Sequence, residues 1–92
     1  WNVLPAETVD GVNVSYYAMV PEAGPVGVIC HEFGHSLGLP DLYNTLDSGE
    51  DVVGNWDLMA SGSWCNSGNT PCHLSAWSKE DLGWLNITPV TS

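Results

Sequence analysis

The stretch His31-Glu32-Phe33-Gly34-His35-Ser36-Leu37-Gly38-Leu39-Pro40-Asp41 is the most informative part of this chain. Residues i and i+4 of an α-helix lie on one face, so His31 and His35 can direct their ring nitrogens to a single point. Two neutral imidazoles at this spacing are typical zinc ligands. Glu32 lies beside the metal in this arrangement, where its carboxylate can accept a proton from the water that the metal activates. The stretch therefore predicts a catalytic zinc site on a helix.

A catalytic zinc ion usually has three protein ligands and one open position, so a third ligand is needed. Gly38 can adopt the left-handed conformation that ends a helix, and Pro40 prevents the helix from continuing. The chain then turns back and brings Asp41 to the metal, which makes Asp41 the predicted third ligand. The alternative interpretation is a buried helix whose histidines only bond backbone carbonyls.

The first half of the chain has two patterns that predict secondary structure. Apolar and polar residues alternate from Val9 to Val20, which predicts a half-exposed strand that Pro21 ends. From about Pro25 to Leu37 the apolar residues follow helical spacing, and Pro25 suits the first turn of a helix. The two predicted zinc histidines therefore lie on a helix whose other faces are buried.

The second half of the chain is predicted to be mostly loop with one helix. Residues 44–63 are predicted to be an ordered loop with short extended pieces, because it would be costly to expose their apolar side chains together. Thr70-Pro71 resembles a helix start, so a second helix is predicted from His73 to Leu82. Trp77 and the other tryptophans are assigned to the core.

Charge and length limit the classes of function. The 92 residues include eleven acidic side chains and one basic side chain, Lys79, so the formal net charge is −10. This balance argues against binding the phosphates of DNA or RNA. No apolar run approaches the roughly 20 residues that span a bilayer. The length allows one modest core, and without an initiator Met or signal peptide at Trp1 we expect the numbering to begin inside a larger chain.

Acidic residues are concentrated in one segment that is also rich in Gly, Ser and Asn: Asp41, Asp47, Glu50, Asp51 and Asp57. The segment is either a solvated acidic loop or a Ca²⁺ site built from oxygen ligands, although its spacing differs from that of an EF-hand loop. Zn²⁺ and, as an open alternative, Ca²⁺ are therefore the cofactors that the sequence predicts.

The three cysteines have separate interpretations. Cys65 and Cys72 flank a turn-forming segment, and in an oxidising compartment they either form a disulfide or remain free thiols. Cys30 immediately precedes the first predicted zinc ligand on the helix. Its side chain therefore points about 100° away from the zinc face, and it is interpreted as a small buried apolar residue.

Several blocks of the sequence resemble successive blocks of the immune inhibitor A-type secreted metallopeptidases. The blocks cover roughly residues 25 to 85, and they are His31–Tyr43, Trp56–Trp64, His73–Lys79 and Leu82–Trp84. The resemblance implies an α+β, metzincin-like zinc endopeptidase that cleaves proteins outside a bacterial cell. It implies an edge strand, an active-site helix, a loop similar to the methionine turn of metzincins, and a C-terminal helix.

The resemblance also implies how the domain is organised. Residues 1–92 would be a single, partial catalytic domain of a parent chain with further domains, and most of the upper subdomain would precede Trp1. In metzincin-like folds an edge strand of that subdomain pairs with an extended protein or peptide substrate. The predicted strand from Val9 to Val20 is the only part of this chain that would represent it.

By position, the resemblance assigns a role to five residues. His31 and His35 match the zinc-binding histidines, and Glu32 matches the catalytic glutamate. Asp41 matches the aspartate of the extended motif. Met59 matches the methionine of the turn beneath the metal, although an ordinary core methionine is equally consistent with the sequence alone.

Four further residues are candidates for the site. Glu50 and Glu80 are alternatives to the aspartate as third zinc ligand. Tyr43 either donates a hydrogen bond to a tetrahedral intermediate or is a capping aromatic residue. His73 either contacts metal or substrate or is a surface histidine near a helix start.

Two other classes of function remain as alternatives to the peptidase. The first is a non-catalytic, metal-stabilised module that recognises extracellular protein, and the second is an interaction domain without metal. Glu32 argues against the first alternative, since a module without catalysis does not need a base beside its metal.

Overall fold

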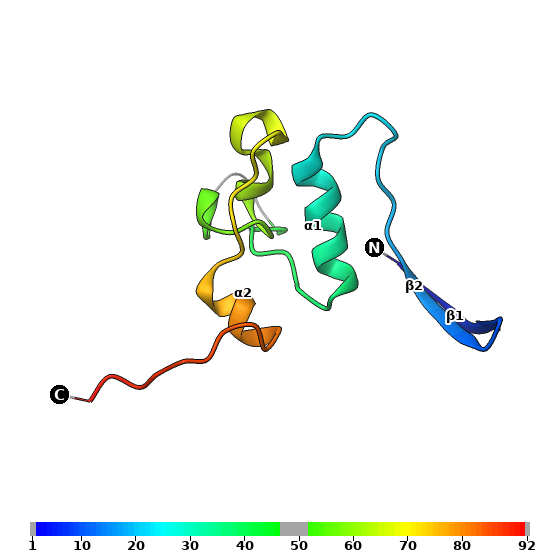
Figure 1. Ribbon diagram of the computed structural model, residues 1–92. Helices are drawn as coiled ribbons and strands as arrows, with labels where there is room; N and C mark the ends of the chain where they lie inside the picture. The colour runs from blue at the N-terminus through cyan, green and yellow to red at the C-terminus, as the bar shows by residue number, and fades with distance from the viewer. Residues whose placement is uncertain (1, 47–51, 92) are drawn as a thin grey trace.

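The computed structural model describes residues 2–46 and 52–91. Figure 1 shows a β-hairpin on one side, a central helix, and a group of short helices on the other side of that helix. In chain order the elements are β1 (Asn2–Val9), β2 (Val12–Tyr17), α1 (Val26–Ser36), the 3-10 helices η1 (Gly54–Trp56) and η2 (Ser61–Gly68), and α2 (Ala76–Asp81). The architecture is α+β, as the sequence predicted.

The predicted single strand over residues 9–20 is instead the second half of an antiparallel hairpin. β1 pairs with β2 so that Val9 lies opposite Val12. The two residues between the strands, Asp10 and Gly11, have φ angles of 51° and 78°. Asp-Gly suits such a two-residue turn, because its backbone twist matches that of the flanking strands. The prediction overlooked this local signal, so it ran one strand from Val9 through the turn and did not include the rest of β1.

The predicted helix from about Pro25 to Leu37 is confirmed as α1. The chain reverses directly after it at Gly38, whose φ angle is 97°. The N–H of Gly38 donates to the carbonyl of His35 (2.9 Å), and the N–H of Leu39 donates to the carbonyl of Gly34 (3.1 Å). These two bonds form a Schellman motif, in which the left-handed residue is usually glycine. The reversal sends the chain back toward the histidine face of α1.

The second helix is shorter than predicted and begins later. Ser75 is the N-cap of α2, and its hydroxyl oxygen accepts the N–H of Ser78 at 3.3 Å. Thr70-Pro71 lies in the loop before it, so the predicted helix start is wrong. The side chain of Trp77 is 53% exposed, which also corrects its assignment to the core. The same correction applies to the tryptophans at positions 56, 64 and 84.

The buried core lies where α1 meets the segment from Asp57 to Ser63. Its apolar members, among the residues whose burial the structure describes, are Leu39, Met59 and Ala60. Its buried polar side chains are His31, His35, Asp57, Ser63 and Ser78. Most of these side chains are polar, so hydrogen bonds must stabilise the core together with apolar contact.

The outer parts of the chain extend away from this core. The radius of gyration is 15.6 Å, compared with about 12 Å for a compact domain of this length. Figure 1 shows the reason, because the hairpin projects to one side and the segment after α2 runs outward to the C-terminus. Within the described ranges, no helix combines the length and the apolar character needed to cross a membrane.

Candidate metal centre

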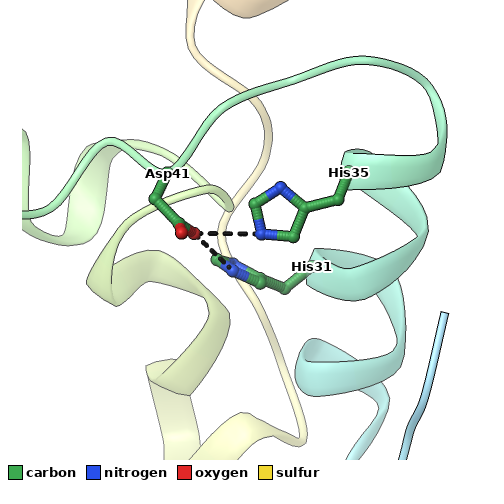
Figure 2. A group of neighbouring side chains, drawn as sticks. All are labelled: His31, His35 and Asp41. Atoms are coloured by element: carbon green, nitrogen blue, oxygen red, sulfur yellow. Dashed lines mark hydrogen bonds and ion pairs between the residues drawn. The ribbon is translucent and has the colours of Figure 1, made fainter. Parts of the chain in front are cut away.

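Two histidines of α1 and an aspartate of the following loop converge on one point (Figure 2). Nε2 of His31 lies 3.1 Å from Oδ1 of Asp41, and Nε2 of His35 lies 3.0 Å from the same oxygen. The histidine side chains are about nine-tenths buried, whereas that of Asp41 is 30% exposed. Two atoms bound to one tetrahedral zinc ion lie about 3.3 Å apart. The three side chains are therefore close to the separations that a shared metal ion requires.

The other ring nitrogen of each histidine faces a backbone carbonyl. Nδ1 of His31 is 2.9 Å from the oxygen of Leu58, and Nδ1 of His35 is 2.8 Å from the oxygen of Leu39. A carbonyl oxygen only accepts hydrogen bonds, so each Nδ1 must carry a proton and donate it. In a neutral imidazole the lone pair is then on Nε2, which is the arrangement usual for histidines that bind metals.

The convergent atoms are therefore all electron-pair donors. The two Nε2 lone pairs and the carboxylate oxygen of Asp41 face one another within 4.8 Å. Such atoms repel one another unless a cation, a proton or a metal ion, lies between them. Two imidazole nitrogens and one carboxylate oxygen make up a set that suits zinc and leaves a fourth position open. The residues present thus fit the metal that the sequence predicts.

Met59 contacts residues adjacent to both the histidines and the aspartate of this group. Its side chain is fully buried and packs against Gly34, where an added Cβ would collide with the methionine sulfur. Its backbone carbonyl accepts the N–H of Leu42 at 2.9 Å. Gly34 lies on α1 between the two histidines, and Leu42 follows Asp41. Met59 therefore positions the helix and the aspartate loop relative to each other.

Asp57 holds the turn that contains Met59, and the sequence analysis assigned it no such role. The carboxylate is fully buried. Its Oδ1 accepts the N–H of Met59 at 2.8 Å, while its Oδ2 accepts the N–H of Ser75 at 3.1 Å and the hydroxyl of Ser78 at 2.7 Å. Burial alone would raise the pKa of Asp57. A hydrogen bond from the Ser75 side chain, together with the bonds from Met59, Ser78 and the Ser75 N–H, lowers the pKa below its ordinary value. The charged carboxylate thus connects the turn that contains Met59 to the start of α2.

Tyr43 lies at the edge of the metal group. Its ring stacks beside that of His31, with centroids 6.2 Å apart and an angle of 25° between the planes. Burial, then the charge of Asp41 and a hydrogen bond to it, and finally the charge of Glu32 raise the pKa of the Tyr43 hydroxyl. The hydroxyl therefore donates to Asp41. Glu32 is half-buried on α1, close enough for its charge to act on that hydroxyl.

Two other predicted site residues, His73 and Glu80, lie outside the group of His31, His35 and Asp41. Glu80 is exposed on α2, and His73 is exposed beside an apolar pocket lined by Phe33 and other residues. Neither belongs to the described cluster of converging ligand atoms. Glu50 lies outside the described residues, as do the acidic positions 47 and 51. Both oxygens of Asp57 already accept hydrogen bonds in a buried environment, so Asp57 is not available to a calcium ion.

Three features of the site were not predicted from the sequence: the two carbonyls that orient the histidines, and the turn at Asp57. They differ in whether a local pattern could have indicated them. The carbonyl of Leu39 is positioned by the Schellman motif at Gly38, which is a local signal. The bond between Asp57 and the N–H two residues later is an Asx-turn, also a local pattern. The carbonyl of Leu58 comes from a segment 27 positions away from His31, and no local pattern indicates that contact.

Comparison with known proteins gives matches over most of the chain. The family model described as "Immune inhibitor A peptidase M6, catalytic domain" matches residues 4–86. "Immune inhibitor A" of Bacillus thuringiensis subsp. alesti is 40% identical over 83 residues, which is 80% of this chain and 12% of that protein. "Pre-pro-metalloprotease PrtV" of Vibrio cholerae serotype O1 (strain M66-2) is 42% identical over 79 residues, 76% of this chain and 9% of that protein.

This chain thus spans about a tenth of the length of the relatives it matches. No solved structure gives a significant match. The matched residues include α1, the aspartate loop, the methionine turn and α2, so they contain the whole group described above. The chain belongs to the immune inhibitor A peptidase M6 family, and its residues 4–86 are part of the catalytic domain of that family.

Proposed function

We propose that this chain carries the metal centre of a zinc-dependent endopeptidase that hydrolyses peptide bonds of extracellular proteins. Membership of a peptidase family supports the proposal, as does a relative named as a metalloprotease. The observation that carries it is the convergence of two Nε2 atoms and a carboxylate while both Nδ1 atoms are held by carbonyls.

In this proposal His31, His35 and Asp41 hold the metal and Glu32 is the general base. Bound zinc would supply a Lewis acid that polarises the scissile carbonyl and makes the attacking water more acidic. Glu32 accepts a proton from that water and later donates it to the departing amine. Tyr43 keeps the Asp41 carboxylate in place through its hydroxyl.

We also propose that the chain is a partial, metzincin-like catalytic domain with Met59 as its methionine-turn residue. The contacts of Met59 with Gly34 and Leu42 support this assignment. The small share of each relative that the chain covers supports further domains in the parent protein. In this proposal the protein is secreted by a bacterial cell, and an extended substrate pairs with a strand edge as in other β-augmented complexes.

The substitution Glu32→Ala tests the proposal in the full-length, zinc-loaded protein. We expect zinc content to remain at the level of the unaltered protein, because Glu32 is not a ligand. We expect cleavage of an unfolded protein substrate to fall by about 10²- to 10⁴-fold, which is the usual contribution of a general base. The measurements are metal analysis by mass spectrometry and a fluorescence assay of casein cleavage.

Glu22→Ala is the matched control, since it removes the same charge from an exposed position in the segment before α1. It should change neither zinc content nor cleavage. Undiminished cleavage by the Glu32→Ala protein would contradict the role of Glu32. An unaltered protein that binds zinc but cleaves nothing would instead favour the non-catalytic, metal-stabilised module.

A further inference from the structure

Cys65 and Cys72 face each other across the loop that ends η2. Their Sγ atoms are 2.7 Å apart and both side chains are half-buried. The contact with Cys65, together with partial loss of solvent and the charge of the neighbouring sulfur, raises the pKa of the Cys72 thiol. Either thiol can donate its proton to the sulfur of the other.

The backbone of the loop brings the two sulfurs together. Asn66 and Ser67 have left-handed φ angles of 51° and 55°, which bend the chain sharply. The N–H of Thr70 donates to the carbonyl of Cys65 at 3.3 Å, and the N–H of Cys72 donates to the carbonyl of Gly62 at 2.8 Å. The two ends of the loop are thus held by separate backbone bonds, so the approach of the cysteines is part of the fold.

The loop is connected to the metal centre through a short series of contacts. Directly after Cys72, the carbonyl of His73 accepts the N–H of Leu58 at 3.2 Å. The carbonyl of Leu58 in turn bonds Nδ1 of His31 at 2.9 Å. On the opposite side, Gly68 packs so closely against Pro25, the N-cap of α1, that a Cβ would collide with the proline ring.

We propose that Cys65 and Cys72 form a disulfide in an oxidising compartment and that this bond strengthens metal retention. With the disulfide formed, the loop fixes the start of α1 through Pro25, and it fixes His73, whose carbonyl bonds Leu58. The orientation of the His31 ring then depends less on weak backbone bonds. Reduction would loosen these contacts and make the metal easier to remove. The metal-retention step rests on the proposed zinc centre, whereas the disulfide itself does not.

The oxidation balances by thiol–disulfide exchange with a small-molecule disulfide such as oxidised glutathione. One cysteine thiolate attacks the oxidant, forms a mixed disulfide and releases one thiolate. The second cysteine thiolate then attacks the protein sulfur of the mixed disulfide and releases the second. The two cysteines lose two protons and two electrons in total, and the oxidant gains them as two thiols.

Cys30 is the competing partner that the test must distinguish. It is half-buried on α1 and lines the same apolar pocket as Cys72. Proteolytic cleavage before aspartate residues distinguishes a Cys65–Cys72 disulfide from a disulfide that involves Cys30. Because aspartates lie at positions 10, 41, 57 and 81, this cleavage puts Cys30 on peptide 10–40, and both Cys65 and Cys72 on peptide 57–80.

The first experiment maps the bond in the full-length protein after equilibration with oxidised glutathione, denaturation and alkylation of free thiols. We expect peptide 57–80 without alkyl groups and lighter by two hydrogen atoms than the reduced peptide. We expect peptide 10–40 to carry one alkyl group on Cys30. Two alkyl groups on peptide 57–80, or a cross-link between the two peptides, would overturn the proposed bond. This result does not depend on whether the protein binds zinc.

The second experiment measures the rate at which a chelator removes zinc from the same protein, before and after reduction. We expect reduction to accelerate zinc loss by about 10-fold, the scale seen when an outer contact of a metal ligand is lost. The Cys65→Ser protein should lose zinc at the fast rate with or without reductant. The Cys30→Ser protein should respond to reductant as the unaltered protein does. Equal rates before and after reduction would overturn the link to metal retention, even if the linked peptide is found.

Discussion

Asp41 and Asp57 have the same side chain, but their different surroundings give the two carboxylates different roles. Asp41 is partly exposed and directs one oxygen at two imidazole nitrogens, so its charge is directed at the metal position. Asp57 is fully buried, and three donors from Met59, Ser75 and Ser78 surround its carboxylate. The first is suited to bind a cation, whereas the second stabilises the turn beneath it.

The substitution Asp41→Asn tests which carboxylate is the third ligand. A neutral amide is a weaker zinc ligand than a carboxylate. Removing a group that only hydrogen-bonds a metal ligand lowers metal affinity by about 10- to 100-fold. We expect Asp41→Asn to lower zinc affinity by more than this. Affinity is measured by competition with a fluorescent chelator. Glu80→Gln removes one charge from the exposed alternative on α2 and should leave affinity unchanged. A large loss with Glu80→Gln and none with Asp41→Asn would reverse the assignment.

The lowered pKa of Asp57 predicts a pH dependence of stability. Because the folded-state pKa is below its unfolded value, the ionised carboxylate stabilises the fold. This stabilisation is complete above the ordinary carboxyl pKa of about 3.9 and is lost as the pH falls through the lower folded-state value. In urea unfolding at a series of pH values, the Asp57→Asn protein should therefore lose less stability on acidification than the unaltered protein. The exposed Asp81→Asn is the control, and parallel pH curves for all three proteins would contradict the prediction.

The elements around the metal centre pack through positions where α1 has no side chain. A Cβ at Gly27 would collide with the backbone carbonyl of Ser63, so glycine allows η2 to lie against the first turn of α1. A Cβ at Gly34 would collide with the sulfur of Met59. Gly27 therefore allows η2, and Gly34 allows Met59, to lie close against α1. Each glycine lowers helix propensity by about 1 kcal/mol relative to alanine.

Alanine substitutions at these glycines should have unequal effects on the free energy of unfolding. Gly34→Ala should destabilise by about 1 kcal/mol, because the flexible Met59 side chain can shift and helix propensity offsets part of the strain. Gly27→Ala should cost about 3 kcal/mol or more, because the Ser63 carbonyl can move only if η2 moves. Urea unfolding of the two proteins measures the difference. Equal losses, or a greater loss for Gly34→Ala, would show that this packing is wrong.

On the scale of the whole molecule, the metal centre and the buried core are largely the same structure. Both histidines of the centre and Met59 belong to the described core, which contains few apolar side chains. Few apolar side chains are buried among the described residues, so hydrophobic burial within them is limited. A bound metal is therefore expected to contribute a large part of the stability of this region.

Metal removal should consequently destabilise the protein. A ligand that binds only the folded state stabilises it by about 4 kcal/mol when its free concentration is about 1,000 times its Kd. We expect a chelator to lower the melting temperature measured by circular dichroism, and added zinc to restore it. The His31→Ala/His35→Ala protein should melt at a low temperature that neither chelator nor zinc changes. Identical melting curves for the unaltered protein with and without chelator would contradict this role of the metal.

Local signals in the sequence are enough to predict several of the elements and site residues. The i and i+4 histidines predicted the convergence on one face of a helix, and Gly38 predicted the reversal that brings Asp41 back. The Asp10-Gly11 turn was equally local but was overlooked. Each of these features depends on backbone preferences and on spacing within a few residues. Such local preferences act independently of contacts with distant parts of the chain.

Which distant groups complete the site depends on contacts that form only in the tertiary structure. The carbonyl of Leu58 orients His31, and Asp57 bonds the start of α2 instead of belonging to an exposed acidic loop. Tertiary contacts also determine that α2 begins at Ala76, after its N-cap Ser75, and that the described tryptophans are exposed. These outcomes depend on contacts between segments far apart in the chain. The energy of such contacts comes from burial and hydrogen bonding in the assembled core, which no local pattern of residues specifies.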